Sequence, residues 1–118
     1  MRNAAVALLL EDEPLISMEI EMVLAGAGFD VSTAMTCKEA LAWLESRNPD
    51  IVIVDIQLRD GPCHQVVDRI IAAGIPFLVH SGDHPGMHDG TPFSRAVWVS
   101  KPSSGNELAE VARALLQT

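Results

Sequence analysis

Five short strand-like runs occur along the chain, four of them mainly apolar and one, residues 31–34, mixed, and between most of them apolar residues recur every three or four positions. Each run is four residues long and lies between turn signals, which is typical of strands buried on both faces of a parallel sheet. The spacing between the runs is that of helices with one apolar face. The sequence therefore predicts an α/β fold in which a strand–helix unit repeats five times, with strands at residues 7–10, 31–34, 51–54, 77–80 and 96–99.

Local signals mark where the helices begin. Pro14 suits the first position of a helix, and Thr36 with Glu39 has the spacing of a capping box. Ser104 and Glu107 repeat that spacing before the last helix. The four regular helices predicted in this way carry inward-facing apolar residues at Ile16, Ile20, Val23, Leu24 and Ala27; Ala40, Leu41 and Leu44; Val66, Val67, Ile70 and Ile71; and Leu108, Val111, Ala112 and Leu115.

The fourth strand–helix unit lacks a regular helical pattern. Residues 83–95 contain Pro85, Gly86, Gly90 and Pro92, and each of these costs about 1 to 3 kcal/mol inside a helix. We therefore expect at most a turn or two of helix there, which makes the fourth helix irregular or shortened.

Composition narrows the function classes. The 118 residues fit one domain, with 48% apolar residues and a net charge of −8. Because the eight basic residues are scattered, we expect no direct binding to nucleic acid and none to a membrane. No apolar run is long enough to span a bilayer, so a cytoplasmic protein is expected. Cys37 and Cys63 lack a CxxC spacing, and both are expected to be free thiols in a reducing compartment.

Carboxylates follow directly after two of the apolar runs. Glu11 and Asp12 end the first, and Asp55 ends the third. The carboxyl ends of parallel strands form the ligand-binding edge of α/β sheets, so these three acids should share one crevice. At about 4 Å and an effective dielectric of about 20, each like-charged pair costs roughly 4 kcal/mol. A cation is therefore required, and Mg²⁺ is the hard divalent ion that oxygen ligands favour.

Two further residues follow strands at the same edge. Ser81 comes after the fourth run, and Lys101, one of only two lysines, comes shortly after the fifth. A carboxylate beside a metal ion, with a hydroxyl and an ammonium nearby, can accept a phosphoryl group and hold its oxygens. The sequence therefore predicts a phosphoacceptor site.

These residues, with Gly82 after Ser81 and Pro102 after Lys101, resemble in kind and order the motifs of the receiver domain of bacterial two-component response regulators, over essentially the whole chain. The resemblance implies a flavodoxin-like, doubly wound (βα)5 sheet of strand order 2-1-3-4-5. It also implies roles for the site residues. Asp55 would be phosphorylated, and Mg²⁺ would be bound by Asp12, Asp55, the backbone carbonyl of Gln57 and, through water, Glu11. Ser81 and Lys101 would bind the phosphoryl oxygens.

The same resemblance implies how the protein would act. The phosphoryl group would come from a histidine kinase or a histidine phosphotransfer protein, and phosphorylation would switch binding to a downstream protein target. Trp98 stands where the family usually has a Tyr or Phe that reports the switch. Arg59 and Cys63 stand where the family usually has a proline and a glycine, which affects the geometry of that loop. With a single receiver domain at 1–118 and no output domain, the chain would perform self-phosphotransfer and autodephosphorylation only, not the reaction of a free-standing enzyme.

Three other interpretations are considered. His80, His84 and His88 recur at four-residue spacing and would suit a transition-metal site if their segment were helical. A receiver fold without phosphorylation would be a constitutive protein-interaction module. A hydrolase of the haloacid-dehalogenase type would need a second acid two residues after the nucleophile, where this chain has Gln57.

Overall fold

The computed structural model describes residues 4–82, 85–101 and 105–117. Five parallel strands form one sheet in the order β2-β1-β3-β4-β5. This flavodoxin-like arrangement confirms the predicted fold and strand order. The strands are β1 (Ala5–Leu10), β2 (Phe29–Ala34), β3 (Ile51–Val54), β4 (Phe77–Ser81) and β5 (Val97–Ser100).

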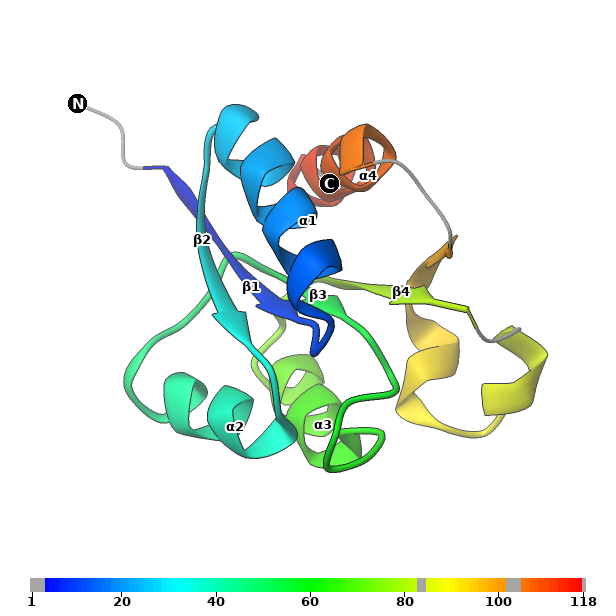
Figure 1. Cartoon of the computed structure of the whole chain (residues 1–118). Coiled ribbons are helices and arrows are strands. Elements are labelled where there is room, and N and C mark those ends of the chain that lie inside the picture. The colour runs from blue at the N-terminus through cyan, green and yellow to red at the C-terminus, as the bar shows by residue number, and fades with distance from the viewer. Residues whose placement is uncertain (1–3, 83–84, 102–104, 118) are drawn as a thin grey trace.

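Helices cover both faces of the sheet. Helices α1 (Pro14–Gly26) and α4 (Gly105–Leu116) pack together on one face, and α2 (Cys37–Ser46) and α3 (His64–Ala72) lie on the other (Figure 1). As predicted, α1 begins at Pro14. The capping box at α2 is also confirmed, since the Glu39 backbone N–H donates to Thr36 Oγ1 over 3.0 Å. Ser104, the predicted cap of the last helix, lies outside the described residues.

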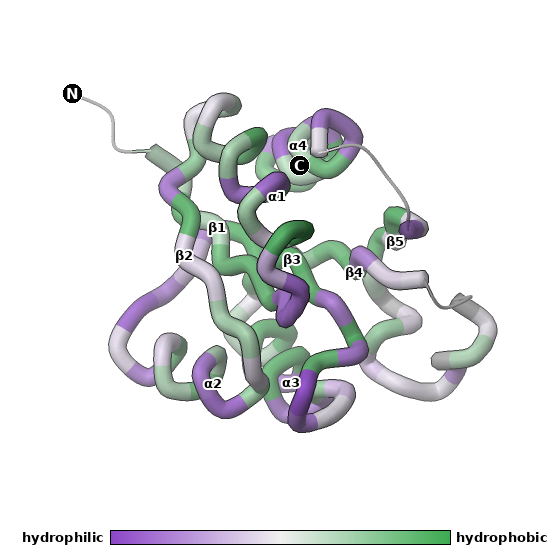
Figure 2. Tube along the Cα trace, in the orientation of Figure 1, coloured by the Kyte–Doolittle hydropathy of each residue, from purple (hydrophilic) through white to green (hydrophobic). Residues whose placement is uncertain are grey.

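The core lies on both sides of the central strands. All four residues of β3 are buried, as are the last four of β1, and the central strands form the most hydrophobic part of the trace (Figure 2). In the β1–β3 register, Leu10 pairs with Val54. The next residues along, Glu11 and Asp55, therefore leave the sheet side by side, and this register brings the acids together.

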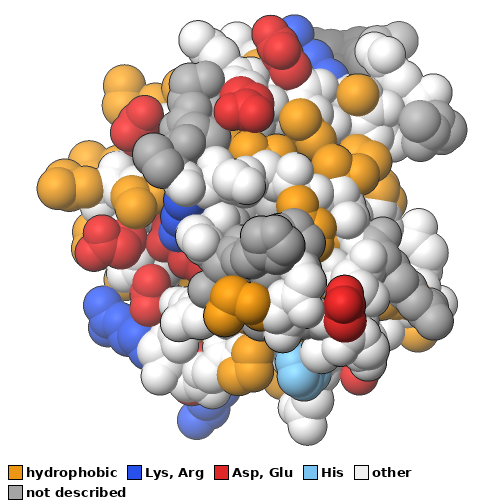
Figure 3. Space-filling view, turned by 90° about the vertical axis from the view of Figure 1, so that its right-hand side faces the viewer, with side chains coloured by type: hydrophobic (Ala, Val, Ile, Leu, Met, Phe, Trp, Pro, Cys, Tyr) orange, Lys and Arg blue, Asp and Glu red, His pale blue; other side chains and the backbone are white. Residues whose placement is uncertain are grey.

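The segment between β4 and β5 contains no regular α-helix among its described residues. It forms two short 3₁₀ helices, η1 (Pro85–His88) and η2 (Pro92–Arg95), as the prolines and glycines predicted. Phe93 of η2 is nevertheless fully buried and anchors the segment to the core under α2 and α3. On the face of the molecule seen from this side, hydrophobic side chains are scattered among polar and charged ones (Figure 3).

Strand bounds differ slightly from those predicted. Pairing of Ala5 with Phe29 extends β1 and β2 toward their N-termini beyond the apolar runs. Ser81 is the last residue of β4 rather than the first residue after it, and β5 starts at Val97 rather than at residue 96. None of the helices in the described ranges has the length and hydropathy needed to cross a membrane.

The prediction of two free thiols is wrong, because Cys37 and Cys63 form a disulfide with a Cα–Cα distance of 5.3 Å. The two cysteines are 26 positions apart in the sequence. They meet because α2 and α3 pack on the same face of the sheet, so the loops that enter these helices are neighbours. A spacing rule that looks only for close pairs along the chain misses such a contact.

Candidate functional site

Three carboxylates meet where β1 and β3 end. One oxygen from each of Glu11, Asp12 and Asp55 can be chosen so that all three lie within 4.8 Å of one another. Glu11 and Asp55 are 1% and 6% exposed, whereas Asp12 is partly exposed. The backbone holds both buried acids in place, since the Glu11 N–H donates to Ala34 O and the Asp55 N–H donates to Leu10 O. This cluster of hard oxygen donors fits the preferences of Mg²⁺.

Lys101, which directly follows the edge strand β5, contacts both buried acids. Its Nζ donates to Asp55 Oδ2 over 2.9 Å and to Glu11 Oε1 over 3.1 Å. Its backbone N–H also donates to Ser81 O over 2.9 Å, which fixes the residue after β5 against the end of β4. The ammonium group thus neutralises part of the negative charge that the fold gathers at this edge.

Burial and charge shift the pKa values of Glu11 and Lys101. Desolvation raises the pKa of Glu11 above its usual value despite the hydrogen bond from Lys101, and the negative charge of Asp55 raises it further. Desolvation by itself would lower the pKa of Lys101. The hydrogen bonds and charges of Asp55 and Glu11 outweigh it, so the pKa of Lys101 is raised. The amine therefore remains a cation at neutral pH.

The other predicted site residues lie in β4, in β5 and in the loop after β3. Ser81 is buried at the end of β4, and Gln57 is exposed in the loop after β3, with its backbone N–H donating to Asp55 Oδ1 over 3.1 Å. Trp98 is partly buried in β5, and its Nε1–H donates to Phe93 O over 3.0 Å. The side chain of Trp98 is therefore bound to the irregular segment between β4 and β5.

The histidine-based metal site is not assembled from described residues. His80 is buried in β4, while His84 and the side chain of His88 lie outside the part of the chain that the structure describes. Among the described residues, the two groups of side chains that could hold a metal ion are Glu11 with Asp12 and Asp55, and Asp60 with the two cysteines. Neither group includes His80.

Burial of His80 makes stability depend on acid pH. Desolvation, helped by the charge of Lys101, lowers the pKa of His80 from its usual 6.5 to about 4. Between these values the unfolded chain binds a proton that the folded chain does not, so stability falls as pH drops from about 6.5 to 4.

Lowering the pH from 7 to 4.5 should reduce the unfolding free energy of both the wild type and a His80→Leu variant. We expect the reduction to be about 2–3 kcal/mol smaller in the variant. Denaturant titrations at both pH values measure this difference. Equal losses in the two proteins would contradict a neutral, buried His80.

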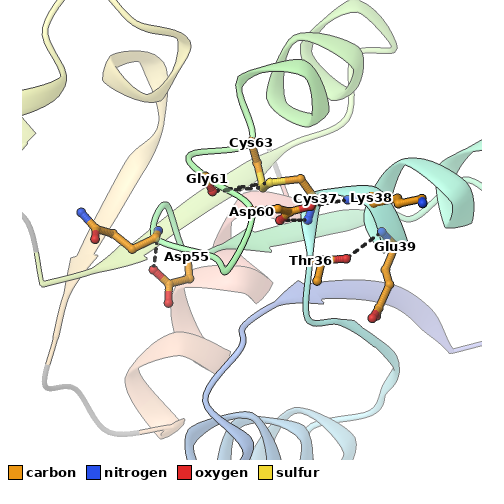
Figure 4. Close-up of a disulfide and its surroundings, with 9 residues drawn as sticks. Thr36, Cys37, Lys38, Glu39, Asp55, Asp60, Gly61 and Cys63 are labelled. Carbon is orange, nitrogen blue, oxygen red and sulfur yellow. Dashed lines mark hydrogen bonds between the residues drawn. A yellow bond between two sulfur atoms is a disulfide. The ribbon is translucent and has the colours of Figure 1, made fainter.

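Sequence reasoning missed a cluster in the loop between β3 and α3. The Asp60 carboxylate accepts from the backbone N–H groups of Cys37 over 2.7 Å and Lys38 over 3.1 Å, at the first turn of α2 (Figure 4). These bonds lower the pKa of Asp60, with the Cys37 N–H as the largest cause. One feature of the sequence pointed to this cluster: Cys63 stands where the family that the chain resembles usually has a glycine.

Comparison with known proteins agrees with this architecture. The family model described as response regulator receiver domain matches residues 7–113. The transcriptional regulatory protein TrcR of Mycobacterium tuberculosis is 29% identical over 114 residues, covering 93% of this chain and 44% of TrcR. The phyllosphere-induced regulator PhyR of Methylorubrum extorquens is 45% identical over 56 residues, covering 46% of this chain and 21% of PhyR. This chain thus spans about half, or less, of the length of these curated relatives.

Solved structures are similar over nearly the whole chain. The receiver domain of PhyR from Erythrobacter litoralis is 28% identical with a TM-score of 0.83, covering 98% of this chain and 92% of that one. The response regulator TrrA from Thermotoga maritima, solved in complex with Mg²⁺-BeF, is 25% identical with a TM-score of 0.82, covering 94% and 98%. The sheet order, the acids at the strand ends and the family match lead to one conclusion: this chain belongs to the family of response regulator receiver domains.

Proposed function

We propose that this chain is a phosphoacceptor in a two-component system or phosphorelay, with the Asp55 carboxylate as the acceptor. The observation that carries the proposal is the position of Lys101, whose Nζ lies 2.9 Å from Asp55 Oδ2 and 3.1 Å from Glu11 Oε1. An ammonium in that place can bind the oxygens of an incoming phosphoryl group, while the second oxygen of Asp55, Oδ1, accepts from the backbone N–H of Gln57.

The donor would be the phosphorylated histidine of a histidine kinase or a histidine phosphotransfer protein. An oxygen of the ionised Asp55 attacks phosphorus, an Asp55 O–P bond forms, and the bond from phosphorus to the donor nitrogen breaks. That nitrogen keeps the electron pair of the broken bond. No general base is needed, because the attacking carboxylate carries no proton, so the protein supplies position and charge neutralisation.

Mg²⁺ is part of the proposal. Asp12, Asp55 and the backbone carbonyl of Gln57 would hold it, with Glu11 acting through water, and the ion would neutralise charge on the transferred group. The crowded oxygen donors support this assignment, and so does the solved relative TrrA with its bound Mg²⁺-BeF.

Ser81 and Trp98 would convert the phosphorylated state into a change of surface. The Ser81 hydroxyl would bind a phosphoryl oxygen and draw in the loop after β4, changing contacts with the segment that Trp98 holds through Phe93 O. A downstream protein would recognise that changed surface.

Intact-mass measurement after incubation with acetyl phosphate tests the acceptor function. We expect the mass of one phosphoryl group to be added with Mg²⁺ present, and little addition when a chelator removes the ion. No mass gain from acetyl phosphate or from a phosphorylated histidine donor would overturn the proposal.

Replacing Lys101 with methionine should slow phosphoryl uptake by about 100-fold, the usual effect of removing one preorganised cationic or hydrogen-bonding group from a transferred oxyanion. The rate of mass gain with acetyl phosphate and Mg²⁺ measures the effect. The other lysine provides a matched control, because Lys38 is exposed at the start of α2, whereas Lys101 is partly buried against Glu11 and Asp55. Equal rates in Lys101→Met and Lys38→Met would remove Lys101 from the mechanism.

A further inference from the structure

The Cys37–Cys63 disulfide ties the loop after Asp55 to a neighbouring helix. Asp55 begins the loop, Cys63 ends it immediately before α3, and Cys37 is the first residue of α2 (Figure 4). Gln57, whose carbonyl is a proposed Mg²⁺ ligand, lies in this loop between Asp55 and Cys63. The bridge therefore closes the same loop that completes the proposed phosphoacceptor site.

The bridge also holds an unfavourable backbone conformation. Cys63 has φ 55° and ψ 36°, and it is the one non-glycine residue in the described ranges with positive φ. Glycine adopts this left-handed conformation freely, whereas a residue with a Cβ does so at a cost that surrounding structure must offset. Breaking the bridge would leave Cys63 free to move toward a more favourable conformation and to carry the loop with it.

Other contacts would keep the two thiols near each other after reduction. The Asp60 carboxylate still accepts from the N–H groups of Cys37 and Lys38. The Gly61 carbonyl oxygen lies 3.5 Å from Cys37 Sγ and 3.7 Å from Cys63 Sγ, which places an acceptor within reach of both thiol groups. A reduced pair held in this way can re-form its bond, as a reversible modification requires.

The two sulfurs differ in access. Cys63 is buried, whereas Cys37 is only partly buried, so an attacking thiolate would reach Cys37 Sγ first. Both sulfurs stand at helix N-termini, which favour a thiolate, while the negative charge of Asp60 opposes it. The hydrogen bonds that the Asp60 carboxylate accepts from two backbone N–H groups reduce the effect of its charge.

We propose that the Cys37–Cys63 bridge is a reversible thiol–disulfide modification site that sets how readily Asp55 is phosphorylated. A dithiol reductant attacks Cys37 Sγ, the Cys37–Cys63 S–S bond breaks, and Cys63 leaves as a thiolate that takes up a proton. The second thiol of the reductant then displaces Cys37 from the mixed disulfide. The protein gains two electrons and two protons, and the reductant becomes a disulfide.

The reduced protein should bind Mg²⁺ less well and accept phosphoryl more slowly. With the bridge closed, the Gln57 carbonyl is held near the position it needs, so less conformational freedom is lost when the ion binds. With the bridge open, the loop must be ordered in the same step. We expect about a fivefold lower Mg²⁺ affinity and phosphorylation rate, which lies at the low end of typical coupling between sites.

The test compares oxidised and dithiothreitol-reduced wild-type protein, with alkylation and intact mass to count free thiols. The phosphorylation rate with acetyl phosphate is measured across a Mg²⁺ titration, and hydrogen exchange is measured over residues 57–63. The Cys37→Ser/Cys63→Ser variant should behave like the reduced protein and ignore dithiothreitol. If it fails to fold, Cys37→Ser alone replaces it, because this change opens the bridge and leaves the residue at position 63 unchanged.

The outcomes separate this inference from the phosphoacceptor proposal on which it rests. Slower phosphorylation and faster loop exchange on reduction support it. Equal phosphorylation rates in the oxidised and reduced protein overturn the redox inference and leave the acceptor function intact. A bridge that never forms, or that dithiothreitol cannot open in the folded protein, has the same consequence. If neither state is phosphorylated, the acceptor function fails, and unchanged loop exchange would then overturn the redox site as well.

Discussion

An Asp55→Asn variant is expected to fold normally and to take up no phosphoryl group from acetyl phosphate, even with Mg²⁺ in excess. The amide of asparagine has the shape of the carboxyl group but is not a nucleophile toward phosphorus. Its oxygen can still accept the hydrogen bond that Lys101 Nζ gives to Asp55 Oδ2. The variant loses the bond that the Gln57 N–H gives to Asp55 Oδ1, but it also removes one negative charge from the crowded set of acids, so its unfolding free energy should stay close to that of the wild type.

Two measurements check this expectation: intact mass for phosphoryl uptake, and denaturant unfolding for stability. Asp68→Asn is the matched control, because Asp68 is an exposed acid on α3, away from the strand ends. The control should be phosphorylated at the wild-type rate. Uptake by Asp55→Asn at the rate of the control would place the acceptor on another residue, and Asp12 would be the first to examine.

Replacing Phe93 with alanine is expected to lower the unfolding free energy by about 3–5 kcal/mol, the usual cost of truncating a fully buried phenylalanine. Phe93 is 0% exposed, and its ring lies 5.2 Å from that of His64, centroid to centroid. Its carbonyl oxygen also accepts from Trp98 Nε1. It is thus the main apolar anchor of a segment that has little regular helix of its own.

The shift of the denaturation midpoint at a constant slope measures this effect. Met87 lies in the same segment and is 69% exposed, so Met87→Ala should change the unfolding free energy by less than about 0.5 kcal/mol. Phe93→Leu, which leaves a smaller cavity, should fall between the two variants. A loss below about 1 kcal/mol in Phe93→Ala would mean that the segment contributes little to the core.

Local patterns predicted those elements whose form depends on neighbours along the chain. The four apolar residues of β3 were predicted with both bounds correct, because a strand covered on both faces has no polar positions to obscure it. The N-terminal parts of β1 and β2 were missed. Ala5 and Phe29 extend these strands by pairing with each other, and an apolar run does not record that pairing.

The same distinction applies to the site. The sequence alone placed acids, a hydroxyl and a lysine at or just after the ends of strands, and the rule that parallel strands end at one edge then predicted their meeting. Tertiary structure decided that Lys101 Nζ contacts Glu11 and Asp55 at once, and that Cys37 and Cys63 are bonded rather than free. The physical reason is distance along the chain: capping and periodicity act over a few residues, whereas these contacts join segments that only the packing of helices and the register of strands bring together.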